Sequence, residues 1–325
     1  MKVLFNTYPI AFDCPGGGEI QLIKTQQALV EQNHEVLFYN QWKPQLHEAE
    51  VIHYFSVFGG SSVFCGYVKQ LGKKLAVSPI LYPHRDLEKY PMPEIISVLN
   101  MADLILPNSH IEAELLSKVC NIPIEKFHVV YNGIDASFMT DPAFDESLFR
   151  KKFDVQGKYL LCVGNIENRK NQLQLARALK NTDHQLILLG NIRDQNYFNE
   201  MMAASNQKIK YLGHLPHDSD LLRSAYLGCE AFVLPSLLET PGLAALEAAA
   251  LGSKVLVTQV GSTTEYFENL AVYVDPDSNE SILNGIHKIL TTPKNDQLKE
   301  HVRSKFSWKN TALQTLAAYQ KIKNQ

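Results

Sequence analysis

Residues 231–251 have the sequence AFVLPSLLETPGLAALEAAAL. The first four residues are apolar and predict a buried strand, which Pro235 and Ser236 end. Alanine and leucine have high helix propensity and dominate residues 243–251, which predicts a helix there. A buried strand, a short turn and a helix are the repeating unit of proteins in which helices cover a parallel β-sheet.

The same alternation of apolar runs and helical patterns continues through the chain. In the first half the strand-like runs are 2–5, 35–39, 51–54, 74–77, 104–106 and 129–130. In the second half they are 159–163, 185–189, 209–212, 231–234, 254–257 and 271–274. This alternation predicts an α/β protein with two doubly wound domains. A charged, helix-like segment at 141–157 separates them, so we expect domains at 1–145 and 146–305 and a helical run at 306–325.

Composition limits the class of protein. The chain has 325 residues, of which 45% are hydrophobic and 20% charged, which suits about two globular domains. No apolar run reaches the roughly 18 to 20 residues that a membrane span needs, and the first run meets Asn6 and Pro9 too early for a signal peptide. The five cysteines are widely spaced and include no C-x-x-C pair, which predicts neither disulfides nor a zinc site. We therefore expect a cytoplasmic protein.

Charge is divided unevenly between the halves. Residues 1–150 contain 11 Lys/Arg and 17 Asp/Glu, and residues 151–325 contain 20 and 17. The net charges are therefore −6 (11 − 17) and +3 (20 − 17). An acidic first half argues against nucleic acid as a partner and against a polybasic patch for anionic lipid. The basic second half suits an anionic ligand such as a nucleoside diphosphate.

Two acidic residues flank the start of the helix predicted at 243–251. Glu239 follows the strand, and Glu247 lies eight positions later (247 − 239 = 8), about one and a half helical turns into the helix. The turn between them consists of Thr240, Pro241, Gly242 and Leu243. A helix N-terminus favours an anion, and two carboxylates beside it suit a sugar joined to a diphosphate. A surface helix with two solvated acids is the alternative that this stretch alone leaves open.

Two cations follow the first strand of the second domain. Gly164 comes at the strand end, and Arg169 and Lys170 come just before the next helix. Arginine binds phosphate oxygens with its two-pronged guanidinium group, and lysine adds a point charge. Cations are unfavourable beside the positive end of a helix dipole, so we favour an anionic ligand over two solvated charges.

Three glycines follow the first strand of the first domain. Gly16, Gly17 and Gly18 precede Glu19 and a helix expected to start near Ile20. The absence of Cβ atoms lets the backbone approach a ligand closely and allows positive φ. The pattern lacks the third glycine of the dinucleotide-binding G-x-G-x-x-G fingerprint, and a simple tight turn stays open as an explanation.

These motifs, in their order along the chain, resemble those of the retaining GT-B glycosyltransferases commonly called family four. Glu-x7-Glu is a signature of that family and is matched here by Glu239 and Glu247. The resemblance implies the GT-B fold: two Rossmann-like domains with parallel sheets facing a cleft, and a final helix, here 306–325, that crosses back to the first domain. It implies that Glu239 contacts the donor sugar and Glu247 the ribose. It also implies that the loop containing Gly17 and Gly18 faces the donor phosphates and the acceptor.

The resemblance assigns further donor contacts. Backbone groups of the segment Gly213, His214 and Leu215 hold the nucleotide base in that family. Many relatives have an arginine directly after the glycine that corresponds to Gly164, where this chain has Asn165. That departure leaves Arg169 to supply the guanidinium group.

Histidines give no clear assignment. Many relatives carry a histidine close to the transferred sugar, after the fourth strand of the first domain. His84 lies several residues beyond that place, and His53 on the preceding strand is a rival. A lone histidine is usually structural, so either role stays open for both.

The function implied by the resemblance is retaining transfer of a sugar from a nucleotide-sugar donor to a hydroxyl of a glycan or glycolipid, as in polysaccharide biosynthesis. Arg169, Lys170 and the helix N-terminus at Gly242 stabilise the departing diphosphate, so no metal or other cofactor is expected. A sugar-nucleotide epimerase on the same fold and a catalytically silent nucleotide-binding subunit are the alternatives. The sugar, the base, the acceptor, the oligomeric state and peripheral contact with the inner face of a membrane are left open.

Overall fold

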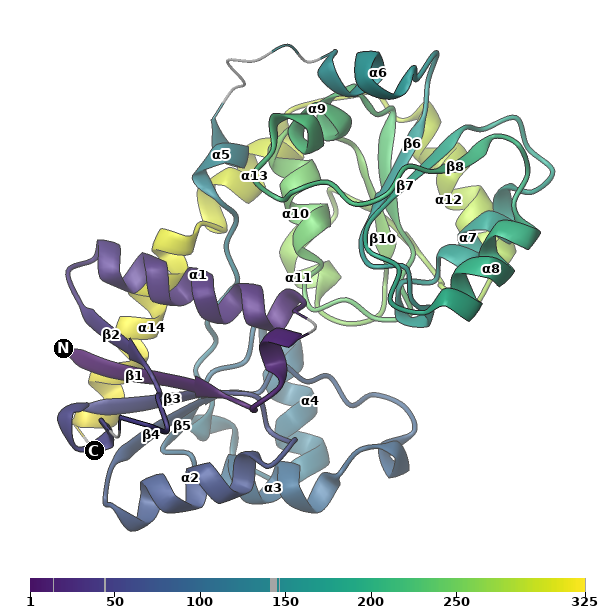
Figure 1. Cartoon of the computed structure of the whole chain (residues 1–325). Coiled ribbons are helices and arrows are strands. Elements are labelled where there is room, and N and C mark those ends of the chain that lie inside the picture. Colours follow the sequence, from purple (N-terminus) through teal and green to yellow (C-terminus); the bar gives the residue numbers. More distant parts are fainter. Residues whose placement is uncertain (14, 44, 141–144, 146, 325) are drawn as a thin grey trace. The chain divides into compact units, whose positions relative to one another are not determined.

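The computed structural model of the chain describes residues 1–13, 15–43, 45–140, 145 and 147–324 (Figure 1). Two compact units make up the chain: Met1–Gly133 together with Phe306–Gln325, and Ile134–Lys305. The division after Gly133 lies twelve residues before the boundary expected after residue 145 (145 − 133 = 12). The residues just after the division belong to the second unit because α5 (Ala136–Met139) packs against α10 (Leu243–Ala250). Part of the expected linker, residues 141–144 and 146, lies outside the described residues.

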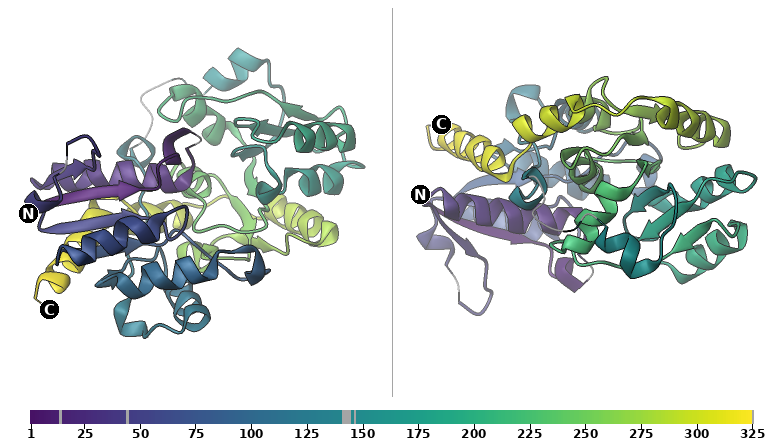
Figure 2. Two further views of the ribbon diagram at one scale, coloured as in Figure 1. Left: turned by 60° about the horizontal axis from the view of Figure 1, so that its bottom comes forward. Right: turned by 90° about the horizontal axis from the view of Figure 1, so that it is seen from above.

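The first unit is a five-stranded parallel sheet with the strand order β2-β1-β3-β4-β5. Its strands are β1 (Lys2–Thr7), β2 (Glu35–Phe38), β3 (Val51–Phe55), β4 (Lys74–Ser78) and β5 (Leu104–Ile105). Its longer helices are α1 (Gly17–Glu31), α2 (Ser61–Gln70), α3 (Met92–Met101), α4 (His110–Cys120) and α14 (Trp308–Lys323). Helices α1 and α14 pack together on one face, and α2 and α3 pack together on the other (Figures 1 and 2). All of β3 is buried, as expected for a parallel strand covered on both sides.

The C-terminal helix α14 is part of the core of the first unit. Tyr319 is fully buried, and its hydroxyl lies 2.6 Å from Nδ1 of His53 on β3. The other ring nitrogen of His53 lies 2.9 Å from Oγ of Ser78 on β4. Both nitrogens of this buried histidine are therefore engaged within the fold, and burial lowers its pKa to about 3. His53 therefore ties α14 to the sheet.

The second unit is a six-stranded parallel sheet with the order β11-β10-β9-β6-β7-β8. Its strands are β6 (Leu160–Val163), β7 (Leu186–Leu189), β8 (Ile209–Tyr211), β9 (Ala231–Leu234), β10 (Val255–Thr258) and β11 (Val272–Val274). Besides α5 and α10, its helices are α6 (Leu148–Phe153), α7 (Gln172–Leu179), α8 (Gln195–Ala204), α9 (Asp220–Gly228), α11 (Thr263–Phe267), α12 (Asn279–Thr291) and α13 (Gln297–Lys305). Helices α7, α8 and α12 lie on one face, and α9, α10 and α13 lie on the other (Figure 1).

Each predicted strand is present except the one at 129–130. There the backbone N–H of His128 donates to the carbonyl of Ile105 over 2.8 Å, and the N–H of Val130 donates to the carbonyl of Pro107 over 2.9 Å. Proline has no N–H to return to a neighbouring strand, so the pairing with β5 stays short. The segment is therefore an extended chain beside the sheet edge.

The helix after the glycine-rich loop begins earlier than predicted. Helix α1 starts at Gly17 and not near Ile20, and the Glu19 carboxylate accepts the Gly16 N–H over 2.7 Å. Gly17 and Gly18 therefore lie in the first helical turn, and neither uses the positive φ that glycine allows. Gly18 still allows a close approach, since a Cβ there would lie 3.3 Å from the side chain of Ile80 in the loop after β4.

Candidate active site

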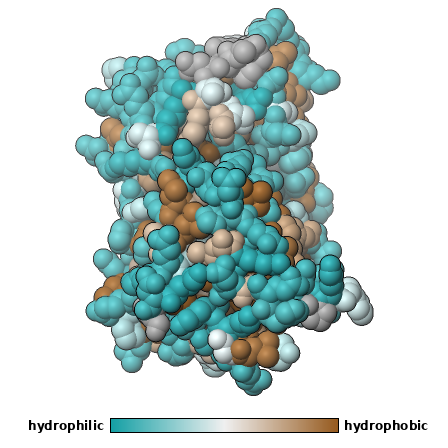
Figure 3. Space-filling model, turned by 90° about the vertical axis from the view of Figure 1, so that its left-hand side faces the viewer, coloured by the Kyte–Doolittle hydropathy of each residue, from teal (hydrophilic) through white to brown (hydrophobic). Residues whose placement is uncertain are grey.

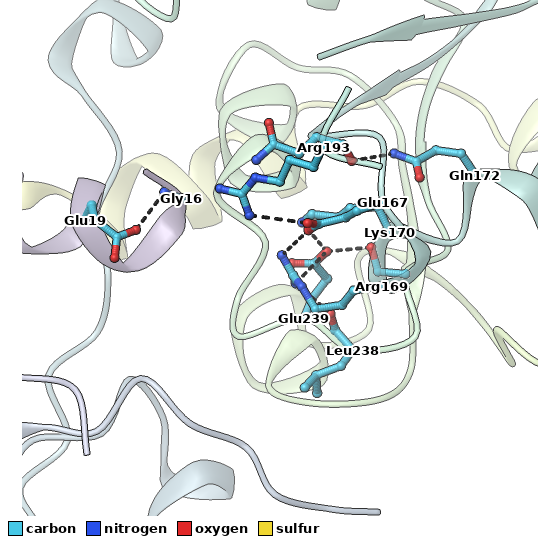
Figure 4. A network of polar contacts seen from close by, with 11 residues as sticks. Gly16, Glu19, Glu167, Arg169, Lys170, Gln172, Arg193, Leu238 and Glu239 are labelled. Carbon is cyan, nitrogen blue, oxygen red and sulfur yellow. Dashed lines mark hydrogen bonds and ion pairs between the residues drawn. The ribbon is translucent and has the colours of Figure 1, made fainter. Parts of the chain in front are cut away.

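The second unit buries a carboxylate at the carboxyl ends of two neighbouring strands. Glu239 follows β9, Lys170 follows β6, and these strands are adjacent in the sheet. The Lys170 ammonium lies 2.6 Å from Oε1 of Glu239, and the hydroxyl of Ser236 donates to the same oxygen over 2.5 Å (Figure 4). The Arg169 guanidinium lies 4.0 Å from that oxygen. The predicted cations and the first predicted acid thus form one cluster.

Two opposing influences set the pKa of Glu239. Its side chain is only 4% exposed, and this burial raises the pKa of the carboxyl. The charges of Lys170 and Arg169 and the hydrogen bonds from Lys170 and Ser236 outweigh burial, so the net pKa is lowered. Glu239 is therefore an ionised, acceptor-only group.

A turn after β10 holds the backbone of Glu239. The N–H of Glu239 donates to the carbonyl of Val260 over 3.2 Å, and the carbonyl of Glu239 accepts the N–H of Ser262 over 2.9 Å. Gly261, between these two, has φ +104°, and a Cβ on it would lie 2.1 Å from the Glu239 carbonyl oxygen. Only glycine fits there, because both the conformation and the approach exclude a side chain.

The Glu239 carboxylate also lies against the start of α10. Gly242 precedes the helix with φ +89°, and a Cβ added to it would lie 3.3 Å from Oε2 of Glu239. Thr240, Pro241 and Leu243 complete the turn into the helix, as predicted. The first N–H groups of a helix have no partner within the helix and attract negative charge. The buried acid and the helix start therefore form one polar corner.

The second predicted acid, Glu247, lies in α10 and is 6% exposed. His217 Nε2 lies 2.6 Å from its Oε1, and the Tyr226 hydroxyl donates to its Oε2 over 3.0 Å. The other ring nitrogen of His217, Nδ1, lies 3.5 Å from a carboxylate oxygen of Asp135. Burial raises the pKa of Tyr226 well above its usual value, and the charge and hydrogen bond of Glu247 raise it further. Glu247 is thus fixed in place by a histidine and a tyrosine that remains protonated.

His217 and Tyr226 were not predicted from the sequence. His217 is the second residue beyond the predicted base-binding segment, in a loop, and Tyr226 is the single aromatic residue of α9. Neither belongs to a motif. A sequence contains no signal for them, because their role comes from facing a residue 30 or 21 positions away.

Arg193 is a further cation that sequence analysis missed. It follows β7, the other neighbour of β6, and its NH1 lies 3.3 Å from Oε2 of Glu167. Oε1 of the same Glu167 lies 3.1 Å from NH2 of Arg169. The cluster therefore contains three cations and two carboxylates, counting Lys170 and Glu239 (Figure 4).

Glycines bring the loops of this cluster close together. Lys170 extends over Gly164, whose Cβ position lies 3.5 Å from Cε of the lysine. The carbonyl of the next residue, Asn165, accepts from the amide of Gln172 over 2.9 Å. In the segment predicted to hold the base, Gly213 has φ +85° and its carbonyl accepts the Gly190 N–H over 2.9 Å. His214 is exposed there and Leu215 is buried.

The first unit has a cavity of about 150 Å³ at the carboxyl ends of β1, β3 and β4. The residues that line it include Thr7, Tyr8, Gly18, Glu19, Ser56 and Ile80. This is the place in the strand order where the chain reverses direction across the sheet, which is where open α/β sheets bind ligands. The Tyr8 hydroxyl donates to Glu19 over 3.2 Å. His84 lies in the loop after β4, half-buried, with its ring centroid 5.5 Å from that of Tyr82.

Within the described part of the chain, no three His, Cys, Asp or Glu side chains are grouped so that they could hold a metal ion. The described helices also include none whose length and apolar character would allow it to cross a bilayer. On the face drawn in Figure 3, hydrophilic side chains predominate and apolar residues are interspersed among them.

Two Rossmann-like units with parallel sheets define the class of protein as GT-B. Solved structures agree: the Anabaena protein HepE in complex with UDP has a TM-score of 0.78 and 20% identity, covering 99% of this chain and 100% of its own. Sucrose-phosphate synthase from Thermosynechococcus elongatus has a TM-score of 0.80 and 16% identity, covering 99% and 98%. At these identities the similarity concerns the fold.

The glycosyl transferases group 1 family model matches residues 143–305, and the chain belongs to this family. An uncharacterized glycosyltransferase of Methanocaldococcus jannaschii is 28% identical over 243 residues, which are 70% of this chain and 62% of that protein. O-antigen chain mannosyltransferase B of Escherichia coli is 27% identical over 255 residues, which are 73% and 66%. The chain thus spans about six-tenths of the length of these relatives.

Proposed function

We propose that this protein transfers a sugar from a nucleoside diphosphate donor to a hydroxyl group, with retention of configuration at the anomeric carbon. The observation that carries the proposal is the buried, ionised Glu239 beside Lys170, Arg169 and the start of α10. A carboxylate accepts hydrogen bonds from sugar hydroxyls, and the adjacent cations bind a diphosphate. The names of the relatives, which include a mannosyltransferase and an N-acetylgalactosaminyltransferase, support the same reaction class.

In the proposed reaction, the bond between the anomeric carbon and the diphosphate oxygen breaks, and a bond from the acceptor oxygen forms on the same face of the sugar. Negative charge grows on the departing diphosphate. Lys170, Arg169 and the N–H groups that follow Gly242 stabilise this charge as it develops, because they are fixed in place before the reaction. The acceptor proton passes to an oxygen of the departing phosphate, so the mechanism needs no separate base.

Glu247 is proposed to bind the ribose of the donor. Each carboxylate oxygen accepts two hydrogen bonds, so the contacts with His217 and Tyr226 leave acceptor capacity for a diol. The same two contacts fix the direction of the carboxylate. Backbone groups around Gly213 are proposed to hold the base. HepE, which shares the fold, has been solved with UDP and with UDP-glucose, and those complexes support a nucleotide-sugar donor here.

The acceptor is proposed to bind the first unit, at the cavity beside Gly18 and Glu19. Tyr8 and Glu19 would hold an acceptor hydroxyl there. A glycan or glycolipid acceptor, with the enzyme in the cytoplasm and in peripheral contact with a membrane, belongs to the same proposal and is supported by the O-antigen enzymes among the relatives. His84 is proposed as a second contact for the sugar, besides Glu239.

A thermal-shift screen with UDP, GDP and ADP tests the donor site. Binding at 100 times Kd stabilises a protein by about 2.7 kcal/mol, which is readily measured. We expect one base to raise Tm, and we expect Glu247→Ala to reduce that shift because the ribose contact is lost. No shift with any nucleotide, in a folded protein, would overturn the proposal.

Product analysis separates the alternatives. With the nucleotide sugar that binds, the proposal requires free nucleoside diphosphate together with a glycosylated acceptor. An epimerase would return a different sugar nucleotide and release no diphosphate. A silent subunit would bind the donor without turnover, hydrolysis included.

A further inference from the structure

Asn165 stands where many family members have an arginine, and the structure shows a guanidinium group brought to that place from another loop. We propose that Arg193 binds the donor diphosphate and that Asn165 is the positioning residue that holds it. This inference rests on the proposed function, because it assigns a residue to the same donor site. It differs from the sequence expectation, in which Arg169 alone supplies the guanidinium group.

The backbone fixes Arg193 beside residue 165. After β6 and β7 the two loops continue side by side: the N–H of Ile166 donates to the carbonyl of Asn191 over 2.8 Å, and the N–H of Arg193 donates to the carbonyl of Ile166 over 3.2 Å. Gly190 allows this approach, since its φ is +149° and a Cβ on it would lie 2.0 Å from the Gly164 oxygen. The position of Arg193 therefore follows from the sheet and not from a flexible loop.

The side chain of Arg193 is held by two partners. With the amide oxygen of Asn165 turned toward the guanidinium, that oxygen accepts from Nε over 3.0 Å and from NH2 over 3.2 Å. On the other edge, NH1 lies 3.3 Å from Glu167. Asn165 thus binds two prongs of the guanidinium fork at once, which fixes its plane as well as its position. The side chain is one quarter exposed, so a ligand can reach it.

The charges of the cluster suit a diphosphate. Arg169, Lys170 and Arg193 face Glu167 and Glu239, which leaves an excess of one positive charge (3 − 2 = 1). Glu167 contacts both arginines, at 3.1 Å and 3.3 Å, so it offsets their mutual repulsion and holds them on either side of one carboxylate. Two guanidinium groups and an ammonium placed together match the several oxygens of a diphosphate.

Binding measurements with Arg193→Gln test the proposal. The probes are UDP, GDP and ADP, measured by isothermal titration calorimetry, and the unphosphorylated nucleoside of the same base, measured by an NMR titration. We expect a loss of about 10-fold to 100-fold in affinity for the diphosphate, as for one charged hydrogen-bonded contact, and an unchanged affinity for the nucleoside. The matched control is Arg177→Gln, because Arg177 is a surface arginine of the same unit that pairs with Glu200 at 2.8 Å.

A second pair of variants tests the role of Asn165. Asn165→Ala should weaken diphosphate binding less than Arg193→Gln does, because Arg193 stays present but is no longer oriented. Placing the arginine at position 165, in the double variant Asn165→Arg with Arg193→Gln, should recover most of the affinity. Thermal unfolding of each variant without ligand checks that the fold is retained.

The outcomes separate this inference from the proposed function. If the wild type binds a nucleoside diphosphate and Arg193→Gln binds it equally well, Arg193 is no ligand and this inference alone is wrong. If Arg193→Gln weakens the diphosphate and the nucleoside to the same degree, Arg193 acts on the structure of the pocket, and the inference is again wrong. A wild type that binds no nucleoside diphosphate would overturn the proposed function and the inference together.

Discussion

Lys170 and Glu239 form an ion pair that is almost fully buried, with side chains 13% and 4% exposed. Two charges taken out of water are stable only as long as both are present, because each compensates the desolvation of the other. Ser236 adds a hydrogen bond to the same carboxylate oxygen. Replacing only one residue of this pair should therefore lower the free energy of unfolding.

We predict that Lys170→Met lowers the free energy of unfolding by about 3 to 5 kcal/mol, because it leaves the Glu239 charge buried without its partner. Adding Glu239→Gln should restore most of that stability and none of the activity, since the polar corner proposed to bind the donor is gone. Urea unfolding of the two variants and the wild type measures this. Equal stability of single and double variants would show that the pair is not coupled.

His53 makes the stability of the first unit depend on pH. Its pKa in the folded protein is about 3, because burial disfavours the charged ring, whereas an unfolded histidine titrates near 6.5. Below pH 6.5, His53 is therefore protonated in the unfolded chain but stays neutral in the folded protein. The free energy of unfolding is therefore unaffected by His53 above pH 6.5, and it decreases as the pH falls from 6.5 toward 3.

At pH 5 we predict that protonation of His53 in the unfolded state costs the wild type about 2 kcal/mol relative to neutral pH. His53→Gln, which cannot be protonated and keeps polar atoms for Tyr319 and Ser78, should lose correspondingly less stability between pH 7.5 and pH 5. Urea unfolding at the two pH values gives the difference. Parallel losses in the two proteins would contradict the assignment.

At the scale of elements, the ends of neighbouring strands place the site, and glycines allow their loops to meet. Strand β9 lies next to β6, and β6 lies next to β7, so Glu239, Lys170 and Arg193 arrive at one edge of the sheet. Gly261 and Gly190 lie where one loop backbone passes within contact of another. A change at either glycine should therefore act on the site as well as on stability.

We predict that Gly261→Ala destabilises the protein by about 2 to 5 kcal/mol, from left-handed strain together with the contact with the Glu239 carbonyl. It should also weaken nucleotide binding, because Glu239 must move. Gly157→Ala is the matched control: Gly157 has φ +69° with nothing within 4 Å of a Cβ, so strain alone should cost about 1 to 2 kcal/mol. Similar effects of the two changes on denaturant unfolding and on nucleotide affinity would refute the contact.

At the scale of the whole molecule, the chain leaves the first unit at Gly133 and returns to it at Phe306. The two crossing segments touch within the first unit, since a Cβ on Gly133 would lie 2.2 Å from the backbone nitrogen of Trp308. The hydroxyl of Thr311 also donates to the carbonyl of Tyr131 over 2.8 Å. Helix α14 is therefore part of the first core although it follows the second unit in sequence.

We predict that a chain ending at Lys305 loses the structure of the first unit and retains that of the second. Removing α14 exposes the face of α1 and leaves His53 without Tyr319, whereas the second unit keeps its own sheet and core. Hydrogen exchange followed by mass spectrometry should show fast exchange in peptides from Met1–Gly133 and protection in peptides from Ile134–Lys305. Equal protection in both units would contradict this account.

Sequence patterns predicted most elements and about half of the site. Apolar runs and helix propensity are local, so the strands and the helix at Leu243–Ala250 were within reach of the sequence. Motifs identified Glu239, Glu247, Arg169 and Lys170 as candidates. The strand at 129–130 and the helix start near Ile20 were wrong, because Pro107 shortens the pairing with β5 and the bond from the Gly16 N–H to Glu19 starts the helix earlier.

The sequence by itself determined the α/β class, the two repeating halves and four charged residues of the candidate site, Glu239, Glu247, Arg169 and Lys170, because each depends on neighbours within a few positions. Only the tertiary structure decided which residues contact each other. Lys170 contacts Glu239, 69 positions away in the sequence, and His53 contacts Tyr319, 266 positions away. Arg193 and His217 likewise belong to the candidate site only through contacts with residues distant in the sequence. The physical reason is that the order of strands in the sheet, set by packing of the whole unit, brings distant loops to one edge, and no local pattern records that order.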